Sequence, residues 1–308
     1  MKILKVCLVQ ALLLGGIHAS HAQTAAQDTY PSQPIRWIVP YSAGSGSDSA
    51  ARLIAERLPA LLGQPVVIDN KPGAGGVLGT DLAAKAKPDG YTMVWGGNAP
   101  LAISPALQKT MPFDSIKDFQ PITRVAIAPL LLVAHPKLGV RSLSELVALA
   151  KRKPNQLSYA SPGNGTTSHL SMELLKQASG TQIAHVPYKG TTPGVADLLG
   201  GHVDVMIDSV AALAPSVNDG KLIPLAVTSG QRVAAMPQIP TIKESGFPDI
   251  QTEAWMGALL PAGAPQQVVA RLSAAFEKVL SDPEVRSTMS DRYGFEVAPT
   301  TPAQFSEF

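Results

Sequence analysis

The sequence predicts an α/β protein of two mainly parallel-sheet lobes, with helices on both faces and two chain crossings that make a hinged clamshell. Short apolar runs of strand length alternate with amphipathic helical patterns, which is typical of parallel sheets covered by helices. Loops rich in glycine, serine and threonine follow several of these runs. About 286 residues follow the first 22, more than one hydrophobic core usually occupies, so two domains are expected.

The N-terminus has the features of a secretory signal. A basic start at residues 1–5 precedes an apolar run at 6–17, and small residues lead to Ala22. The apolar run is too short to span a membrane. We expect residues 1–22 to be removed and the protein to be periplasmic. The single cysteine, Cys7, lies inside this segment, so the exported chain is expected to form no disulfide.

Charge and motif content exclude several classes of partner. Removing the signal, with its Lys2 and Lys5, lowers the Lys and Arg count from 25 to 23, which equals the 23 acidic residues. A chain with net charge near zero has no basic field for nucleic acid or an anionic membrane. Neither glycine-rich loop completes a dinucleotide-binding spacing, because position 49 is Ser and position 78 is Leu. We therefore expect no nucleic acid partner and no cofactor.

The functional prediction rests first on residues 36–55. Apolar positions 35–39 predict a buried strand, residues 41–47 lack bulky aliphatic side chains, and a helical pattern follows. Ser47 or Asp48 is placed to cap this helix. The partial positive charge of the helix N-terminus then faces a loop of free N–H groups, which is an anion-binding arrangement.

The same order of strand, small-residue loop and helix recurs twice. It occurs at residues 65–86, with the loop at 70–77, and at residues 157–179, with the loop at 161–168. In open α/β sheets, ligands bind in the crevice outside the carboxyl ends of the strands. We therefore expect these loops to converge on one small anion.

The remaining elements follow from periodicity and from signals at helix ends. Pro59 is expected to bend or restart the first helix. Ser142 and Glu145 have capping-box spacing, Gly180 is a C-cap, and Thr192 caps the following helix. The expected strands are 35–39, 65–69, 91–95, 119–126, 130–134, 157–160, 183–186, 203–207, 223–228 and 253–260, and the expected helices are 47–62, 77–86, 142–153, 167–179, 192–199 and 265–280.

The chain is expected to cross into the second lobe near Arg124 and to return near Gly230. The first domain then comprises residues 30–124 and 232–308, and the second comprises residues 125–231. Two crossings between α/β lobes give a clamshell that closes around a ligand held between strand ends.

Several polar residues admit more than one role. Asp48 is either a helix cap or first-turn acid, or a ligand contact. Asp208 binds either a ligand amino group or only neighbouring loop amides. Ser168 beside His169 raises the question of nucleophilic catalysis, but adjacent helical residues do not face each other and the Gly-x-Ser-x-Gly elbow is missing.

Two further groups favour structural roles. His202 and Asp204 lie on one strand face, but two ligands without a third make a poor metal site. The three tryptophans lie in strand patterns typical of a hydrophobic core, at Trp37, Trp95 and Trp255.

Seven segments carry a family resemblance over essentially the whole exported chain. They are residues 40–48 (PYSAGSGSD), 62–76 (LGQPVVIDNKPGAGG), 88–92 (PDGYT), 159–170 (YASPGNGTTSHL), 186–190 (VPYKG), 201–206 (GHVDVM) and 237–248 (PQIPTIKESGFP). In this order and spacing they resemble solute-binding proteins of the tripartite tricarboxylate transporter family, the TctC or Bug type. The resemblance implies a periplasmic-binding-protein fold.

The resemblance also implies how the ligand is held. Family members bind a small carboxylate with backbone amides, hydroxyls and ordered water rather than a dedicated arginine, and without covalent chemistry. A further C-terminal helix beyond Phe308 is implied as well. The ligand-binding positions carried over from the family are Tyr41, Ser45, Gly46, Ser47, Asp48, Gly75, Gly76, Asn98, Asn164, Thr166, Thr167, Ser168, Tyr188, Gly190, Thr191 and Asp208.

The function expected from the sequence is periplasmic capture of a small organic acid and its delivery to the membrane permease subunits of a tripartite tricarboxylate transporter. Dicarboxylates, amino acids and aromatic carboxylates all fit a cleft of amides and hydroxyls. A ligand-loaded sensor partner of a membrane receptor uses the same fold and is not distinguished by sequence. A third hypothesis is an exported hydrolase using Ser168 or Ser47. We expect no enzyme activity, no metal site and a monomer.

Overall fold

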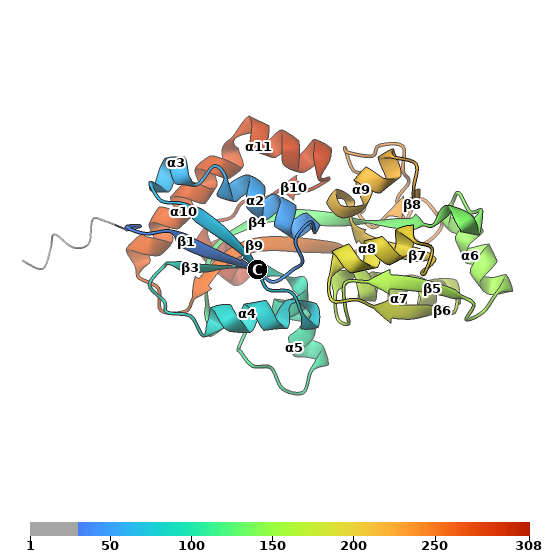
Figure 1. Cartoon of the computed structure of the whole chain (residues 1–308), viewed down its shortest axis with the longest axis horizontal. Helices are drawn as coiled ribbons and strands as arrows, with labels where there is room; N and C mark the ends of the chain where they lie inside the picture. The colour runs from blue at the N-terminus through green and yellow to red at the C-terminus, as the bar shows by residue number, and fades with distance from the viewer. Residues whose placement is uncertain (1–29) are drawn as a thin grey trace, which may run out of the picture.

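The computed structural model of the protein describes residues 30–308, so the signal expected at residues 1–22 lies outside the described residues. One curved sheet runs along the molecule, and helices cover both of its faces (Figure 1). The strand order is β2-β1-β3-β9-β4-β7-β5-β6, with β8 and β10 also paired to β4. No helix within residues 30–308 is long and apolar enough to cross a membrane.

The first lobe lies at the end of the molecule where the N-terminal strands pair (Figure 1). It shares strand β4 (Phe119–Ala134) with the second lobe. Its own elements are β1 (Ile35–Val39), α2 (Gly46–Ala55), α3 (Pro59–Leu62), β2 (Val66–Asn70), η1 (Ala74–Gly76), α4 (Val77–Ala84), β3 (Thr92–Gly97), η2 (Ala99–Ile103), α5 (Ser104–Leu107), β9 (Glu253–Pro261), α10 (Gln266–Ser281), α11 (Pro283–Ser287), η4 (Thr288–Arg292), β10 (Glu296–Val297) and α12 (Pro302–Glu307).

The second lobe is built on the end of β4 and on the strands that pair beside it. Its elements are η3 (Pro136–Leu138), α6 (Leu143–Arg152), β5 (Leu157–Ser161), α7 (Thr167–Ser179), β6 (Ile183–Pro187), α8 (Thr191–Leu199), β7 (Val205–Ser209), α9 (Val210–Asn218) and β8 (Ile223–Val227).

The central strands β1, β3, β4 and β7 are mostly buried because helices cover both faces of the sheet, and successive side chains point to opposite faces. In β1, Trp37 packs toward α2 and α10, whereas Ile38 packs toward α4 and α12. In β4, Leu132 joins the core under α6 and α7, and Leu131 joins the core under α8 and α9. This alternation gives each lobe a core on either side of its sheet.

Strand β4 is a single strand of 16 residues that belongs to both lobes. Its residues 119–129 pair with β9, and residues 130–134 pair with β7. We expected two separate extended segments, 119–126 and 130–134, and Pro129 between them cannot donate a ladder hydrogen bond. The strand is continuous because Pro129 lies where the neighbouring strand of β4 changes from β9 to β7.

The α/β clamshell is confirmed, but the expectation of mainly parallel sheets was wrong. Pairing is parallel for β1 with β2 and β3, and for β5 with β6 and β7. Every pair made by β4 or β9 is antiparallel. The sheet is mixed because the chain passes between the lobes on these two strands, which run in opposite directions.

Residues between Gly230 and β9 pack against the cores of the second lobe. Met236 and Ile239 pack with the core under α8 and α9, and Ile242 and Ile250 pack with the core under α6 and α7. The segment between β8 and β9 is therefore part of the second lobe's packing. We expected residues 30–124 and 232–308 to form one domain and residues 125–231 the other. This division of the chain stays a prediction.

Helix ends at the loops also differ from the expected positions. The cap of α2 is Ser45, whose Oγ accepts a hydrogen bond from the Asp48 N–H, so the helix starts before Ser47. Helix α8 starts at Thr191 after Gly190, which leaves the Thr192 side chain free of a capping role. A new helix, α3, starts at Pro59 as expected.

Candidate ligand-binding site

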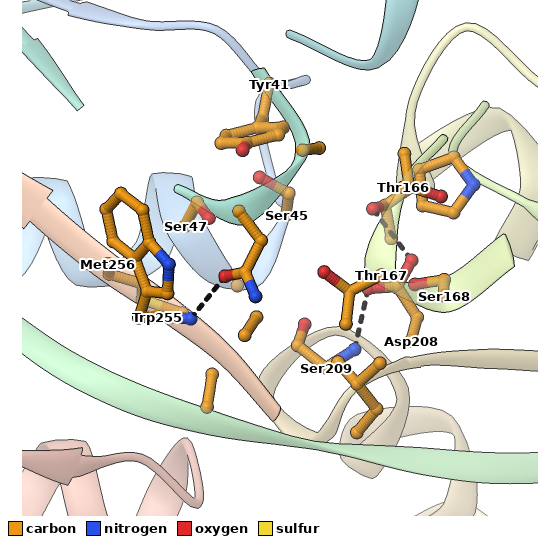
Figure 2. A pocket seen from close by; sticks show the side chains of 18 of the residues that line it. Tyr41, Ser45, Ser47, Thr166, Thr167, Ser168, Asp208, Ser209, Trp255 and Met256 are labelled. Carbon is orange, nitrogen blue, oxygen red and sulfur yellow. Dashed lines mark hydrogen bonds between the residues drawn. The ribbon is translucent and has the colours of Figure 1, made fainter. Parts of the chain in front are cut away.

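A cavity of about 80 Å³ lies between the two lobes. Its volume holds roughly five to eight water molecules, which suits a ligand of few heavy atoms. Figure 2 shows Tyr41, Ser45 and Ser47 on one side and Thr166, Thr167, Ser168, Asp208 and Ser209 on the other. The lining residues are Tyr41, Ser45, Gly46, Ser47, Trp95, Asn98, Ala99, Ala128, Leu130, Pro162, Thr166, Thr167, Ser168, Thr191, Asp208, Ser209, Ala254, Trp255 and Met256.

Four helices begin at this cavity. Lining residues occupy the N-cap or the first turn of α2, α7, α8 and α9. The first amides of a helix have no acceptor within the helix, and the helix dipole adds partial positive charge there. The cavity therefore receives positive potential from helix ends of both lobes.

The α2 loop is held from behind by Asp48. Its carboxylate accepts hydrogen bonds from Gly44 N at 2.8 Å, from Arg52 Nε at 3.0 Å and from Asn70 Nδ2 at 2.9 Å. Burial opposes ionisation, but the hydrogen bonds from Arg52, Gly44 and Asn70 prevail and lower the pKa of Asp48. Asp48 does not line the cavity, so its role is to position the loop.

The α7 loop presents hydroxyls without a catalytic base. Thr166 accepts from the His169 N–H at 3.2 Å and donates to the Gly163 carbonyl at 2.8 Å, which fixes the loop before Thr167. His169 Nδ1 accepts the Gly165 N–H at 3.2 Å, and burial lowers the pKa of His169. The ring of His169 stacks on His185 at 4.3 Å and is absent from the cavity lining.

Asp208 is the ionisable residue that enters the cavity wall from the second lobe. Its Oδ1 accepts the Ser209 N–H at 2.6 Å and its Oδ2 accepts the Thr191 hydroxyl at 2.9 Å. Burial raises the pKa of Asp208 to about 6. Among the described residues that line the cavity, none is a lysine, arginine or histidine.

Most of the predicted site residues meet in this cavity. Those that line it are Tyr41, Ser45, Gly46, Ser47, Asn98, Thr166, Thr167, Ser168, Thr191 and Asp208. A smaller neighbouring cavity is lined by three more, Gly75, Gly76 and Gly190.

Three predicted residues line neither cavity. Asp48 lies behind its loop, as described above, and the Tyr188 hydroxyl donates to Asp197 at 2.6 Å. Asn164 is exposed, and its backbone carbonyl faces Gly75 of the other lobe. All three lie outside the pocket lining, where they hold or contact the loops around it.

Sequence reasoning missed the apolar floor and one polar residue. The floor includes Leu130 and Met256 from the strands that cross between lobes, and two tryptophans assigned to the core, Trp95 and Trp255, reach the lining. No local signal marks a strand residue as cavity-lining rather than core. Ser209 was also missed, although its place directly after Asp208 at a strand end was a usable signal.

The two lobes touch each other beside the cavity. Thr192 Oγ1 donates to the Ala43 carbonyl at 2.7 Å across the cleft. At Gly46 a Cβ would lie 2.4 Å from Ser209 Oγ, and at Gly190 it would lie 2.8 Å from Ser42 Oγ. Glycine at these positions lets the two lobes approach closely, so the structure is that of a closed cleft.

This fold and site define a two-lobed ligand-binding protein, with a small anion-attracting cavity enclosed between lobes that are joined by crossing strands. The sequence matches the family described as "Tripartite tricarboxylate transporter family receptor" over residues 50–308. The chain belongs to this family, which confirms the resemblance drawn from the sequence motifs.

Individual relatives are similar over most of their length. The Protein BugT of Bordetella pertussis is 37% identical over 282 residues, which cover 90% of this chain and 86% of that protein. The structure of R. palustris Rpa4515 with adipate has a TM-score of 0.88 and 34% identity, covering 90% of this chain and 93% of that one. MatC from Rhodopseudomonas palustris, with bound malate, has a TM-score of 0.84 and 31% identity, covering 90% and 95%.

Proposed function

We propose that the protein captures a small organic carboxylate between its lobes and delivers it to the permease subunits of a tripartite tricarboxylate transporter. The observation that carries this proposal is the meeting of four helix N-termini at a cavity whose described lining holds no cationic side chain. Helix N-termini attract anions through free amides and the helix dipole. An anion is thus bound by neutral donors and is free to leave without breaking an ion pair.

Two similar structures support a carboxylate as the ligand. One is described with adipate and the other with malate, and both cover at least nine-tenths of this chain's length. Burial raises the pKa of the Tyr41 hydroxyl, so this side chain stays a neutral donor at the cavity wall.

We propose further that ligand binding and cleft closure are coupled. The contacts of Thr192 with Ala43 and of Ser209 with Gly46 join the lobes, so they form only when the cleft closes. A conformational change follows a ligand only if the ligand interacts more favourably with one state. Here the closed state places helix N-termini of both lobes against the same ligand.

We propose no catalytic activity. Ser161 Oγ lies 2.6 Å from His185 Nε2, which resembles a nucleophile with its base, but Ser161 is 0% exposed and does not line the cavity. Burial and the neighbouring His169 lower the pKa of His185 to about 4. We also propose that residues 1–22 direct export to the periplasm, where the protein acts as a monomer.

The experiment that tests this function is a thermal-shift screen of the purified protein against malate, adipate, acidic amino acids and aromatic acids, each beside its neutral amide. We expect a rise of several degrees in Tm with at least one acid and no rise with its amide, because binding to the folded state alone stabilises it. A protein that is folded by circular dichroism and shifts with no acid would contradict the proposal. Turnover of any bound acid would contradict the absence of catalysis.

A further inference from the structure

Ser209 occupies the N-cap of α9 but does not cap it. A serine at this position ordinarily accepts a hydrogen bond from an N–H of the first helical turn. Ser45 and Thr166 make such bonds at α2 and α7, whereas the Ser209 side chain makes none at α9. The first amides of α9 are therefore left without the acceptor that the sequence offers.

The Ser209 hydroxyl is also buried and unpartnered. The residue is 6% exposed, and within residues 30–308 its Oγ has no hydrogen-bond partner. It lines the cavity, and Figure 2 shows the hydroxyl directed into it. A buried hydroxyl without a partner is unfavourable, and an acceptor supplied by a ligand removes that cost.

The Ser209 hydroxyl lies near the Asp208 carboxyl and partly offsets the rise that burial causes in the pKa of Asp208, but the two groups do not meet the geometry of a hydrogen bond. Asp208 accepts the Ser209 backbone N–H at 2.6 Å and the Thr191 hydroxyl at 2.9 Å, so these two donors are already occupied. What still faces the cavity is the Ser209 hydroxyl together with the N-terminus of α9, a helix of nine residues. Directly opposite is Gly46, where a Cβ would lie 2.4 Å from Ser209 Oγ.

From these observations we propose that the Ser209 hydroxyl and the N-terminus of α9 form a subsite for a carboxylate group of the ligand. A carboxylate at this place accepts from Ser209 on the second lobe and lies beside the first amides of α2 on the first lobe. It thereby bridges the lobes at their closest approach. The subsite rests on the proposed carboxylate-binding function and assigns one of its donors to a residue outside the predicted site.

The test compares the parent protein with Ser209→Ala by calorimetric titration with malate and with adipate. Loss of a hydrogen bond to a charged group is expected to weaken binding roughly 10- to 100-fold. The Tm of the ligand-free protein is expected to stay unchanged or to rise, since the removed hydroxyl has no partner in the protein. Ser216→Ala, at the other end of α9, makes the same chemical change outside the cavity and is expected to bind as the parent does.

Three results overturn the proposal. If Ser209→Ala binds as tightly as the parent, the subsite is wrong while the carboxylate-binding function stands. If the ligand-free Tm falls together with the affinity, the hydroxyl is structural. If the parent binds no acid at all, both the subsite and the proposed function fall. A crystal structure of the parent with its acid supports the subsite by placing a carboxylate oxygen within hydrogen-bond distance of Ser209 Oγ.

Discussion

Replacing Thr192 by valine tests whether a contact outside the ligand cavity controls its affinity. Thr192 Oγ1 donates to the Ala43 carbonyl at 2.7 Å, and Thr192 is exposed and does not line the cavity. Valine keeps the shape of the side chain and removes the hydroxyl. The hydrogen bond joins the lobes, so its loss destabilises the closed state and leaves the open state unchanged.

The expected loss of affinity in Thr192→Val follows from the net free energy of one partly exposed hydrogen bond, about 0.5–1.5 kcal/mol. If the free protein is mainly open, this energy lowers the closing equilibrium by roughly 2- to 12-fold and weakens the apparent affinity by the same factor. Because Thr192 does not touch the cavity, the factor is expected to be equal for every acid that binds. We also expect the loss to appear mainly as faster dissociation.

Calorimetric titration with several acids, stopped-flow dissociation rates and small-angle scattering of the ligand-free protein measure these effects. Thr192→Ser keeps the hydroxyl and serves as the matched control, with affinity close to that of the parent. An affinity loss of different size for different acids, or an equal loss in the serine variant, would mean that the Thr192 hydroxyl does not act through closure of the cleft. Unchanged affinity in the valine variant would show that the contact does not stabilise closure.

Two further predictions concern the cavity wall. Because burial raises the pKa of Asp208 from 3.8 to about 6, the stability that its protonation provides is complete below pH 3.8 and is lost as pH rises through 6. Asp208→Asn is therefore expected to reduce the fall in unfolding free energy between pH 4 and 7 by about 2 kcal/mol, measured by urea titration. In Gly46→Ala the new Cβ would meet Ser209 Oγ at 2.4 Å, so closure is opposed and affinity is expected to fall roughly tenfold or more, measured by calorimetry.

Both predictions have outcomes that contradict them. A pH profile of Asp208→Asn parallel to that of the parent would mean that this carboxyl is not the titrating group. For Gly46→Ala, an unchanged affinity together with an unchanged scattering profile would mean that the lobes do not close through this contact. For Asp208→Asn, the slopes of unfolding free energy against pH are compared with those of the parent. A hydrogen bond lost at Asp208 changes the absolute stability but not this slope.

The sequence predicted most strands and helices because their hydrophobic periods are strong and local. Pro59 restarts a helix and Gly180 ends one in the αL conformation, as their chemistry requires. Helix starts were less certain, because the α2 loop offers Ser45, Ser47 and Asp48 as caps at close spacing. Only the three-dimensional turn selects Ser45, since its Oγ reaches the Asp48 N–H.

Strand pairing was not predictable from the local pattern. A strand that is covered on both faces is a near-continuous apolar run, and this local pattern does not give the direction of its neighbours. The direction of β4 and β9 depends on where the chain crosses between lobes, which involves residues more than one hundred positions apart. The mixed sheet and the single long β4 are therefore tertiary outcomes.

The α/β class, the family and the loops that follow the strands are predictable from the sequence, because they depend on composition, order and spacing. Which loop residues face the ligand cavity depends instead on how the two lobes pack. Asp48 does not line the cavity because its carboxylate binds three donors of its own lobe. Ser209 lines the cavity, and its hydroxyl has no hydrogen-bond partner among the described residues. The role of a polar side chain depends on which donors and acceptors its neighbours already occupy, and packing between distant segments sets those neighbours.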